Sequence, residues 1–173
     1  MNQHTNQKLH LLTLAGVFTA LTAVGTLFIQ IPTPTKGYIN LGDCFVNLSA
    51  WILGGAYGAA AAGIGSALAD LISGYAIYAP ATLIIKALMA VASYQIYHKL
   101  SEKSDSFRSR LLAASVAELI MLLGYAVFDL ILYHSLATAV FGMGSSVVQG
   151  IAGVASSVLV HELLIKKFSF NTK

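Results

Sequence analysis

The amino-acid sequence predicts an all-α integral membrane protein: a compact bundle of six transmembrane helices, with both termini in the cytoplasm. Three observations support this fold class. Of the 173 residues, 57% are hydrophobic and only 10% are charged, whereas charged residues make up about 25% of an average soluble domain. Apolar stretches long enough to cross a bilayer recur along the chain. Basic residues gather in alternate loops, which is typical of proteins with several membrane spans.

The helix boundaries follow from the apolar runs and their interruptions. A transmembrane helix needs about 20 mostly apolar residues. Glycines between Gly54 and Gly58 divide one long run into two helices, and Pro80 stands where a helix can begin without losing a hydrogen bond. The length suits a single domain, 1–173. The six predicted helices cover approximately residues 9–30, 40–53, 57–73, 80–100, 111–133 and 143–166. The second is short for a span and is expected to be tilted, partly re-entrant or buried in protein.

Lysine and arginine predict the orientation, because cytoplasmic loops carry an excess of both. With both termini in the cytoplasm, Lys36 is the only basic residue of an outer loop, and most of the others lie inside. The basic loop 101–110 is then expected beside anionic lipid headgroups. The chain is therefore predicted to have the lipid bilayer as a partner and to bind no nucleic acid.

Polar side chains of the predicted helices gather in the outer third of the membrane. Charged groups inside a bilayer are costly, so each is a candidate functional residue. With the predicted orientation, five helices bring polar groups to this depth and tyrosines surround them. The pattern predicts a pocket that is open to the outside, with aromatic walls suited to a small flat ligand. The candidate substrate-binding residues are Tyr38, Asn40, Asp43, Asn47, Tyr75, Tyr78, Lys86, Tyr125, Asp129, Tyr133 and Gln149.

Some of these polar groups have structural alternatives. Asp43 follows a glycine at a helix start, where it either caps the helix or enters the pocket. Asp70 and Lys86 either form an ion pair between two helices or belong to the binding site. Glu118 lies nearer the cytoplasm, where it pairs with Lys99 or Arg110 or meets a partner protein.

The segment 31–38 joins the first two helices on the outer side. Its prolines stiffen the backbone and its glycine permits a turn. The segment is either a simple connector or a lid that folds over the pocket mouth. The candidate lid residues are Pro32, Pro34, Thr35, Lys36 and Gly37.

The first helix carries small residues at four-residue spacing. Such rows let helix backbones approach closely in lipid, either within one bundle or between two membrane proteins. The helix comes first in the chain and has no charge between Lys8 and Lys36, so it is the better candidate for docking another protein. The candidate docking residues are Ala15, Gly16, Thr19, Ala20 and Ala23.

Three segments closely resemble the substrate-binding S components of energy-coupling factor (ECF) vitamin transporters. They are 37–43 (GYINLGD), 63–75 (GIGSALADLISGY) and 78–88 (YAPATLIIKAL). The branch they resemble is the riboflavin type, which also contains proposed hydroxymethylpyrimidine, pyridoxine and pantothenate binders. The resemblance implies a subunit of the prokaryotic cytoplasmic membrane that captures a vitamin or precursor from outside and releases it inside. It also implies a transmembrane T component and two cytoplasmic ATPases as partners, with the small residues of the first helix facing the T component and the segment 31–38 acting as lid.

The chain itself is predicted not to be an enzyme. It has no Walker A pattern, so ATP hydrolysis is expected from the partners, and no cofactor or metal is expected. A nucleophile paired with a base, or a cluster of metal ligands, would be needed for catalysis, and neither pattern occurs. The alternative to an S component is a stand-alone secondary carrier for a small heterocycle, but carriers usually show internal repeats, and none is evident.

The charges of the expected pocket favour one kind of ligand. The pocket offers three aspartates against one lysine, and no arginine occurs between Met1 and Lys103. A carboxylate substrate would prefer a bidentate arginine. The pattern therefore favours a small neutral or weakly basic ring with hydroxyls. A pyridoxine- or hydroxymethylpyrimidine-like ring is ranked first, then riboflavin, then pantothenate.

Overall fold

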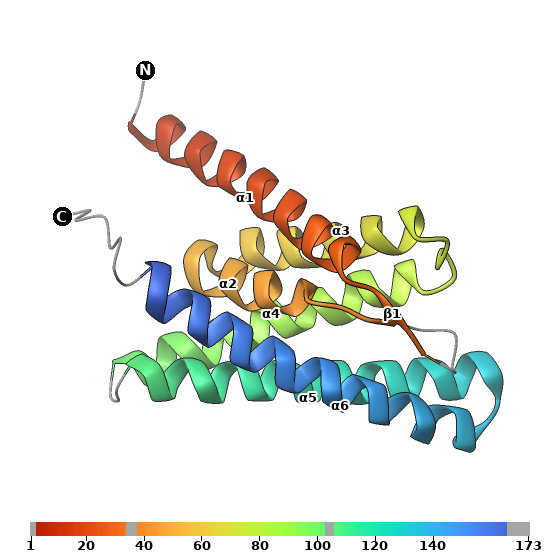
Figure 1. The fold of residues 1–173 in the computed structure, drawn as a ribbon. Coiled ribbons are helices and arrows are strands. Elements are labelled where there is room, and N and C mark those ends of the chain that lie inside the picture. Colours follow the sequence, from red (N-terminus) through yellow and green to blue (C-terminus); the bar gives the residue numbers. More distant parts are fainter. Residues whose placement is uncertain (1–2, 34–37, 103–105, 166–173) are drawn as a thin grey trace.

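The structure, a computed structural model, describes residues 3–33, 38–102 and 106–165. Within these ranges six α-helices run back and forth along one axis, so that the start of α1 and the end of α6 lie at the same end of the bundle (Figure 1). A hairpin of two short strands, each of two residues, follows the first helix, and a π-helical turn, η1, follows the last. The elements are α1 Gln3–Phe28, β1 Ile31–Pro32, β2 Tyr38–Ile39, α2 Gly42–Leu53, α3 Gly55–Ile72, α4 Ala79–Ser101, α5 Ser106–Tyr133, α6 Leu136–Val160 and η1 His161–Ile165.

Five of the described helices, all except α2, are long and apolar enough to cross a membrane. The 12 residues of α2 span about 18 Å at 1.5 Å per residue, against a hydrocarbon core of about 30 Å. Nine of these residues are buried, and α2 contacts α1, α3, α4 and α6. The short helix is thus enclosed by the others, which agrees with one of the three predicted alternatives, burial in protein.

The predicted bounds of the three middle helices agree with the structure to within two residues, but the others differ. The predicted starts at 9, 111 and 143 are too late, because α1, α5 and α6 begin at Gln3, Ser106 and Leu136. The residues missed in α1 and α5, 3–8 and 106–110, are mostly polar, because hydropathy marks only the part of a helix that lies in lipid, whereas backbone hydrogen bonds continue the helix beyond it. The residues missed in α6, 136–142, are mostly apolar, so polarity does not account for that difference. At the start of α6, the Ser135 side chain accepts a hydrogen bond from the Thr138 N–H and acts as a cap. The predicted end at 166 lies outside the described residues.

Glycines decide how closely α3 approaches its neighbours. A Cβ at Gly63 would lie 2.7 Å from the carbonyl oxygen of Leu83 in α4, and a Cβ at Gly65 would lie 2.5 Å from that of Thr19 in α1. Gly54, with φ of 70°, makes the turn between α2 and α3, a conformation that suits glycine. The backbones of α1, α3 and α4 are therefore in contact, as small residues allow in membrane bundles.

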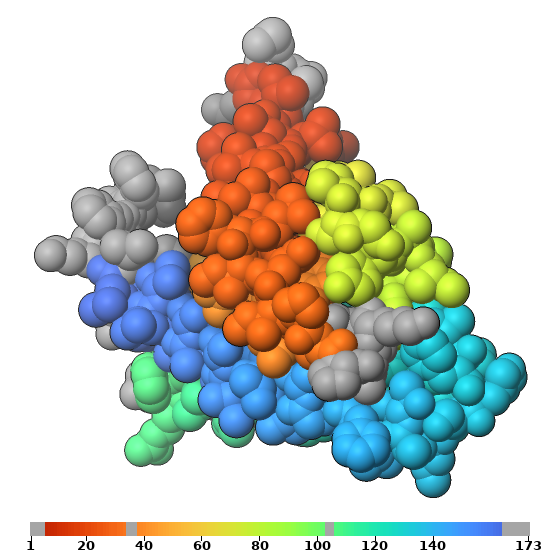
Figure 2. Space-filling model, turned by 45° about the vertical axis from the view of Figure 1, so that its right-hand side comes forward, coloured from red at the N-terminus to blue at the C-terminus, as the bar shows by residue number. Residues whose placement is uncertain are grey.

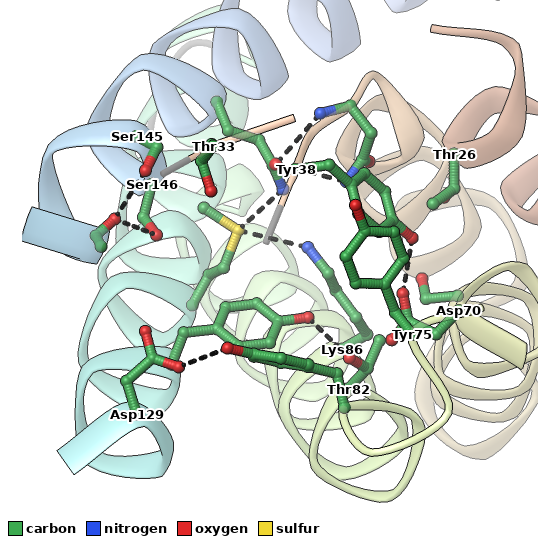
Figure 3. Close-up of a pocket in the computed structure, with 17 residues that line it drawn as sticks. Thr26, Thr33, Tyr38, Asp70, Tyr75, Thr82, Lys86, Asp129, Ser145 and Ser146 are labelled. Carbon is green, nitrogen blue, oxygen red and sulfur yellow. Dashed lines mark hydrogen bonds between the residues drawn. The ribbon is translucent and has the colours of Figure 1, made fainter. Parts of the chain in front are cut away.

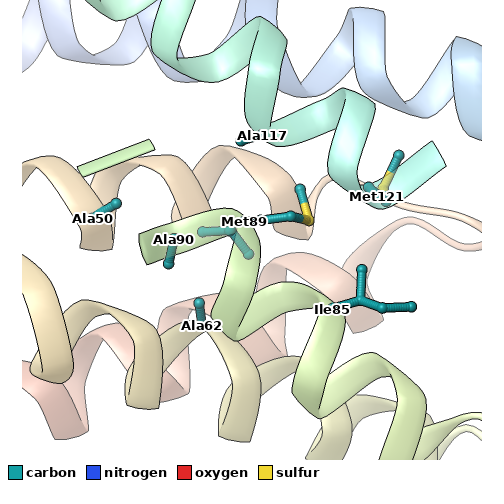
Figure 4. Close-up of a cluster of buried hydrophobic side chains, with 8 residues drawn as sticks. Ala50, Ala62, Ile85, Met89, Ala90, Ala117 and Met121 are labelled. Carbon is teal, nitrogen blue, oxygen red and sulfur yellow. The ribbon is translucent and has the colours of Figure 1, made fainter. Parts of the chain in front are cut away.

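An apolar cluster fills the middle of the bundle between α2, α3, α4 and α5 (Figure 4). Alanines keep the helices close together, and two methionines fill the remaining space, for which their flexible side chains are suited. The buried members are Val46, Ala50, Ala62, Ile85, Met89, Ala90, Ala117 and Met121. Met121 also lines the cavity described below, so the cluster begins where that cavity ends.

Candidate substrate-binding pocket

A cavity lies in the half of the bundle opposite to the start of α1 (Figure 3). Its empty volume is about 640 Å³, including open solvent at its mouth. The hairpin region and all helices except α2 contribute to its lining. The lining residues are Thr26, Thr33, Tyr38, Asn40, Ser66, Asp70, Tyr75, Tyr78, Thr82, Lys86, Met121, Tyr125, Asp129, Gly142, Ser145, Ser146 and Gln149.

Eight of the eleven candidate binding residues line this cavity: Tyr38, Asn40, Tyr75, Tyr78, Lys86, Tyr125, Asp129 and Gln149. The other three lie behind it. Asp43 stands behind Lys86 as its ion-pair partner, and the hydroxyl of Tyr133 lies 3.2 Å from that of Tyr78. Asn47 is fully buried in α2, one helical turn beyond Asp43.

The floor of the pocket is a buried ion pair between Lys86 of α4 and Asp43 of α2. The Gln149 side chain in α6 donates from Nε2 to the second carboxylate oxygen of Asp43 at 2.6 Å. Its own Oε1 accepts from the backbone and side-chain nitrogens of Asn40, at 3.1 and 3.2 Å. The residue at the N-cap of α2 is Leu41, and Asp43 lies inside the first turn, so the interpretation of Asp43 as a helix cap is wrong. Lys86 pairs with Asp43, so the alternative ion pair between Asp70 and Lys86 is wrong too.

The ammonium group of Lys86 is enclosed on its other sides. Its Nζ lies 3.2 Å from the Met121 sulfur, which is a weak acceptor, and 5.8 Å from the ring centroid of Tyr125, within the range of a cation–π contact. Only 3% of the lysine side chain is exposed. The positive charge is therefore balanced and shielded by the protein itself.

One wall of the pocket joins the hairpin to α3. The Tyr38 hydroxyl donates to Asp70 Oδ1 at 2.5 Å, and the Tyr38 and Tyr75 rings lie 4.8 Å apart between centroids. Burial, followed by the nearby Asp70 carboxylate, raises the pKa of Tyr38 above its ordinary range, so the phenol keeps its proton and remains a donor. This wall presents one aromatic pair and one carboxylate to the cavity.

The opposite wall comes from α5 and the start of α4. The Tyr78 hydroxyl donates to Asp129 Oδ1 at 2.9 Å, and the Tyr125 hydroxyl donates to Thr82 at 2.9 Å. Asp129 and Tyr125 are four residues apart, so they share a helix face, as the sequence predicts. Tyr75 and Tyr78 also line the cavity.

The described part of segment 31–38 lies at the cavity. Ile31 and Ile39 pair as antiparallel strand partners, as do Pro32 and Tyr38, and Thr33 contributes to the lining. The predicted lid residues Pro34, Thr35, Lys36 and Gly37 lie outside the described residues. The lid function of the segment remains a prediction.

Eight lining residues were not predicted from the sequence. Asp70 is not counted among them, because a place in the binding site was one of its two predicted alternatives. Five of the eight stand three or four residues from a residue that is prominent in the sequence: Ser66 from Asp70, Thr82 from Lys86, Met121 from Tyr125, and Ser145 and Ser146 from Gln149. Helical periodicity could therefore have identified these five. The other three, Thr26, Thr33 and Gly142, carry no such signal, because packing of separate elements brings them to the cavity.

A second polar network lies beyond the floor, inside α2, α4 and α5. The Asn47 side chain donates to Glu118 Oε1 at 3.2 Å and accepts from Ser93 at 2.9 Å. Ser93 in turn accepts from the indole N–H of Trp51 at 3.0 Å. The interpretation that Glu118 pairs with Lys99 or Arg110 is wrong, because Glu118 faces Asn47, while Arg110 pairs with Glu162.

The structure divides the five candidate docking residues of α1 into two groups. Ala15 packs with Leu53 and Ala61, and the backbones of Thr19 and Ala23 lie against Gly65 of α3. Gly16 and Ala20 are exposed on the other side. Figure 2 shows the N-terminal part of α1 projecting beyond the rest of the bundle.

No group of three or more histidine, cysteine or acidic side chains suited to a metal ion occurs in the part of the chain that the structure describes. The pocket instead combines tyrosine rings, hydroxyls, an amide and carboxylates, which suit an organic ligand with polar edges.

Comparison with known proteins identifies the family. A family model described as "ECF-type riboflavin transporter, S component" matches residues 6–169. A protein of Pyrococcus woesei, described as "Uncharacterized protein in gap 3'region", is 35% identical over 132 residues, which cover 76% of this chain and 85% of that protein. With its apolar helices and a family match over nearly its whole length, the chain is a multi-pass membrane protein that belongs to the ECF-type riboflavin transporter S component family.

Proposed function

We propose that this chain is the high-affinity substrate-binding subunit of an ATP-driven ECF importer in a prokaryotic cytoplasmic membrane. It captures a small water-soluble vitamin or precursor from outside and releases it inside after docking on a T component and two ATPases. The observation that supports this function best is the cavity at one end of the bundle, lined by tyrosines and carboxylates. On its closed side the cavity ends at the buried ion pair between Lys86 and Asp43, beside the apolar cluster, which suits capture from one side of the membrane.

The proposed ligand is a small heterocycle with polar edges. A pyridoxine- or hydroxymethylpyrimidine-like ring remains the first choice, followed by riboflavin and pantothenate. The lining of four tyrosines with Asp70 and Asp129 supports a ring that stacks on aromatic walls and donates hydrogen bonds at its edges. Riboflavin is named in the description of the matching family, and it belongs in any test of this ranking.

Calorimetry on the purified chain in detergent tests the capture function. The panel contains pyridoxine, hydroxymethylpyrimidine, riboflavin and pantothenate, each titrated into wild type and Asp129→Asn. We expect tight binding of one compound and a clear loss of affinity in the variant. Glu102→Gln is the matched control, since it removes the same charge from a side chain that is 67% exposed at the end of α4. A folded sample that binds none of the four would contradict the proposed ligand class.

Vesicles distinguish an S component from a stand-alone carrier. An S component alone is expected to bind ligand without moving it across the membrane, and uptake should appear when the T component, the ATPases and ATP are supplied. Equilibration of ligand across vesicles that contain the chain alone would instead support a secondary carrier. The docking surface proposed for the T component is the exposed side of α1 at Gly16 and Ala20.

A further inference from the structure

Resting on the function proposed above, we infer that the pocket selects a ligand without net negative charge and rejects its phosphorylated form. Asp70 and Asp129 receive the hydrogen-bond donors, or the positive charge, of this ligand from two sides. This selectivity goes beyond the ranking of vitamins, since it applies to any ring that the pocket accepts.

The lysine of the pocket is already paired. Among the lining residues that the structure describes, Lys86 carries the only formal positive charge of a lysine or arginine. Its ammonium pairs with Asp43, whose other oxygen is bound by Gln149. A phosphate or carboxylate on the ligand would have to break this buried pair or remain without a counter-charge, and both are costly.

The carboxylate of Asp70 has room for a further hydrogen-bond donor. Its Oδ1 accepts a hydrogen bond from Tyr38, while its Oδ2 is buried without a hydrogen bond from the described residues, although Thr82 lies beside the carboxylate. The residue is 5% exposed and lines the cavity. A buried acceptor without a donor is unfavourable, so a donor group on the ligand would complete this site.

Asp129 adds a second carboxylate to the lining. This residue is also 5% exposed and faces the cavity from α5, and one of its oxygens accepts a hydrogen bond from Tyr78. Asp70 and Asp129 lie on different sides of the cavity, with Lys86 between them (Figure 3). Because Asp43 balances Lys86, these two aspartates give the described lining more formal negative than formal positive charge. An anionic ligand is therefore disfavoured, because like charges placed against each other at a binding site repel.

The ligand class follows from these contacts. It is a ring that carries amino, hydroxyl or protonated ring-nitrogen groups at two edges and that lies against the aromatic wall. The Tyr38 and Tyr75 rings, 4.8 Å apart between centroids, would also favour a positive charge on the ring through cation–π attraction. A phosphate ester of the same ring would place two negative charges beside Asp70 or Asp129.

Matched pairs of compounds test the inference for whichever ring the pocket accepts. Calorimetry compares pyridoxine with pyridoxine 5′-phosphate, hydroxymethylpyrimidine with its phosphate, and riboflavin with its 5′-phosphate. For the ring that binds, we expect the phosphate to bind at least about 100-fold more weakly. In the double variant Asp70→Asn and Asp129→Asn, which keeps acceptors for Tyr38 and Tyr78, this ratio should fall below about tenfold. Glu102→Gln should leave the ratio unchanged.

A second measurement needs no panel. The chain is purified rapidly from cells, the bound molecule is released by heat, and its formula is determined by mass spectrometry. We expect a compound without phosphate or carboxylate. Equal or tighter binding of a phosphate ester, or release of an anionic compound, would overturn the inference and leave the proposed function intact. Absence of binding across the panel and of any released molecule would count against both.

Discussion

Lys86 and Asp43 form an ion pair that is closed off inside the bundle, with side chains that are only 3% and 0% exposed. Asp43 also accepts a hydrogen bond from Gln149, and Gln149 in turn accepts one from the backbone N–H of Asn40 just before α2. The pair therefore connects three helices directly beneath the proposed binding site. Buried pairs of this kind contribute little net stability compared with apolar packing, but they are costly to break on one side only.

Removing one member of this pair should destabilise the protein strongly. Lys86→Met leaves the Asp43 carboxylate buried without its cation, and we expect a loss of about 3–5 kcal/mol of unfolding free energy. The double variant Lys86→Met with Asp43→Asn should recover most of this loss, because no uncompensated charge remains. Thermal and denaturant unfolding in detergent measure both changes. A double variant no more stable than Lys86→Met alone would show that the pair is not the source of the loss.

Two neighbouring side chains of the second polar network, Asn47 and Glu118, should differ in how much their replacement destabilises the protein. Asn47→Ala removes the partner of both Ser93 and Glu118, so we expect a loss of about 1–3 kcal/mol in unfolding free energy. Glu118→Gln keeps an acceptor for Asn47 and removes a carboxyl whose Oε2 has no partner among the described residues. Its stability should equal or exceed that of wild type in the same unfolding assay. A Glu118→Gln loss as large as that of Asn47→Ala would contradict this account of the network.

The contact between α1 and α3 should tolerate no added methyl group. A Cβ at Gly65 would lie 2.5 Å from the Thr19 carbonyl oxygen, so Gly65→Ala must push the two backbones apart. We expect a loss of about 1–3 kcal/mol. Gly144→Ala is the control, because nothing lies within 4 Å of its added Cβ and alanine favours a helix. The two variants are compared by melting temperature in one detergent, and equal values would argue against close contact at Gly65.

The exposed side of α1 should matter for transport rather than for capture. Gly16→Phe and Ala20→Phe add bulk to surface positions, so we expect each to fold and bind ligand like wild type. Each should reduce ATP-dependent uptake with the T component and ATPases at least about tenfold, because close helix contact in lipid requires small residues. Ala155→Phe, on the exposed surface of α6, is the matched control and should transport normally. Normal uptake by both α1 variants would place docking elsewhere.

Much of the fold and of the candidate site could be predicted from local features of the sequence. Apolar runs indicated helices in lipid, and spacing of four residues placed Tyr125 and Asp129 on one face. Helix direction, with the orientation given by lysines and arginines, then put Lys86 and Gln149 at a common depth near Tyr38, and the structure shows all three around one cavity. These inferences succeeded because they depend only on helix geometry and on the cost of burying charge.

Tertiary structure decided which groups face each other. The choice of Asp43 over Asp70 as the partner of Lys86, and of Asn47 over Arg110 as the partner of Glu118, depends on how each helix is rotated about its axis. The same rotation turns Ala15, Thr19 and Ala23 inward and leaves Gly16 and Ala20 exposed. A sequence specifies the face and depth of a residue on its own helix. The rotation of each helix about its axis is set by the packing of glycines, alanines and methionines between the helices, so only the assembled bundle determines that rotation.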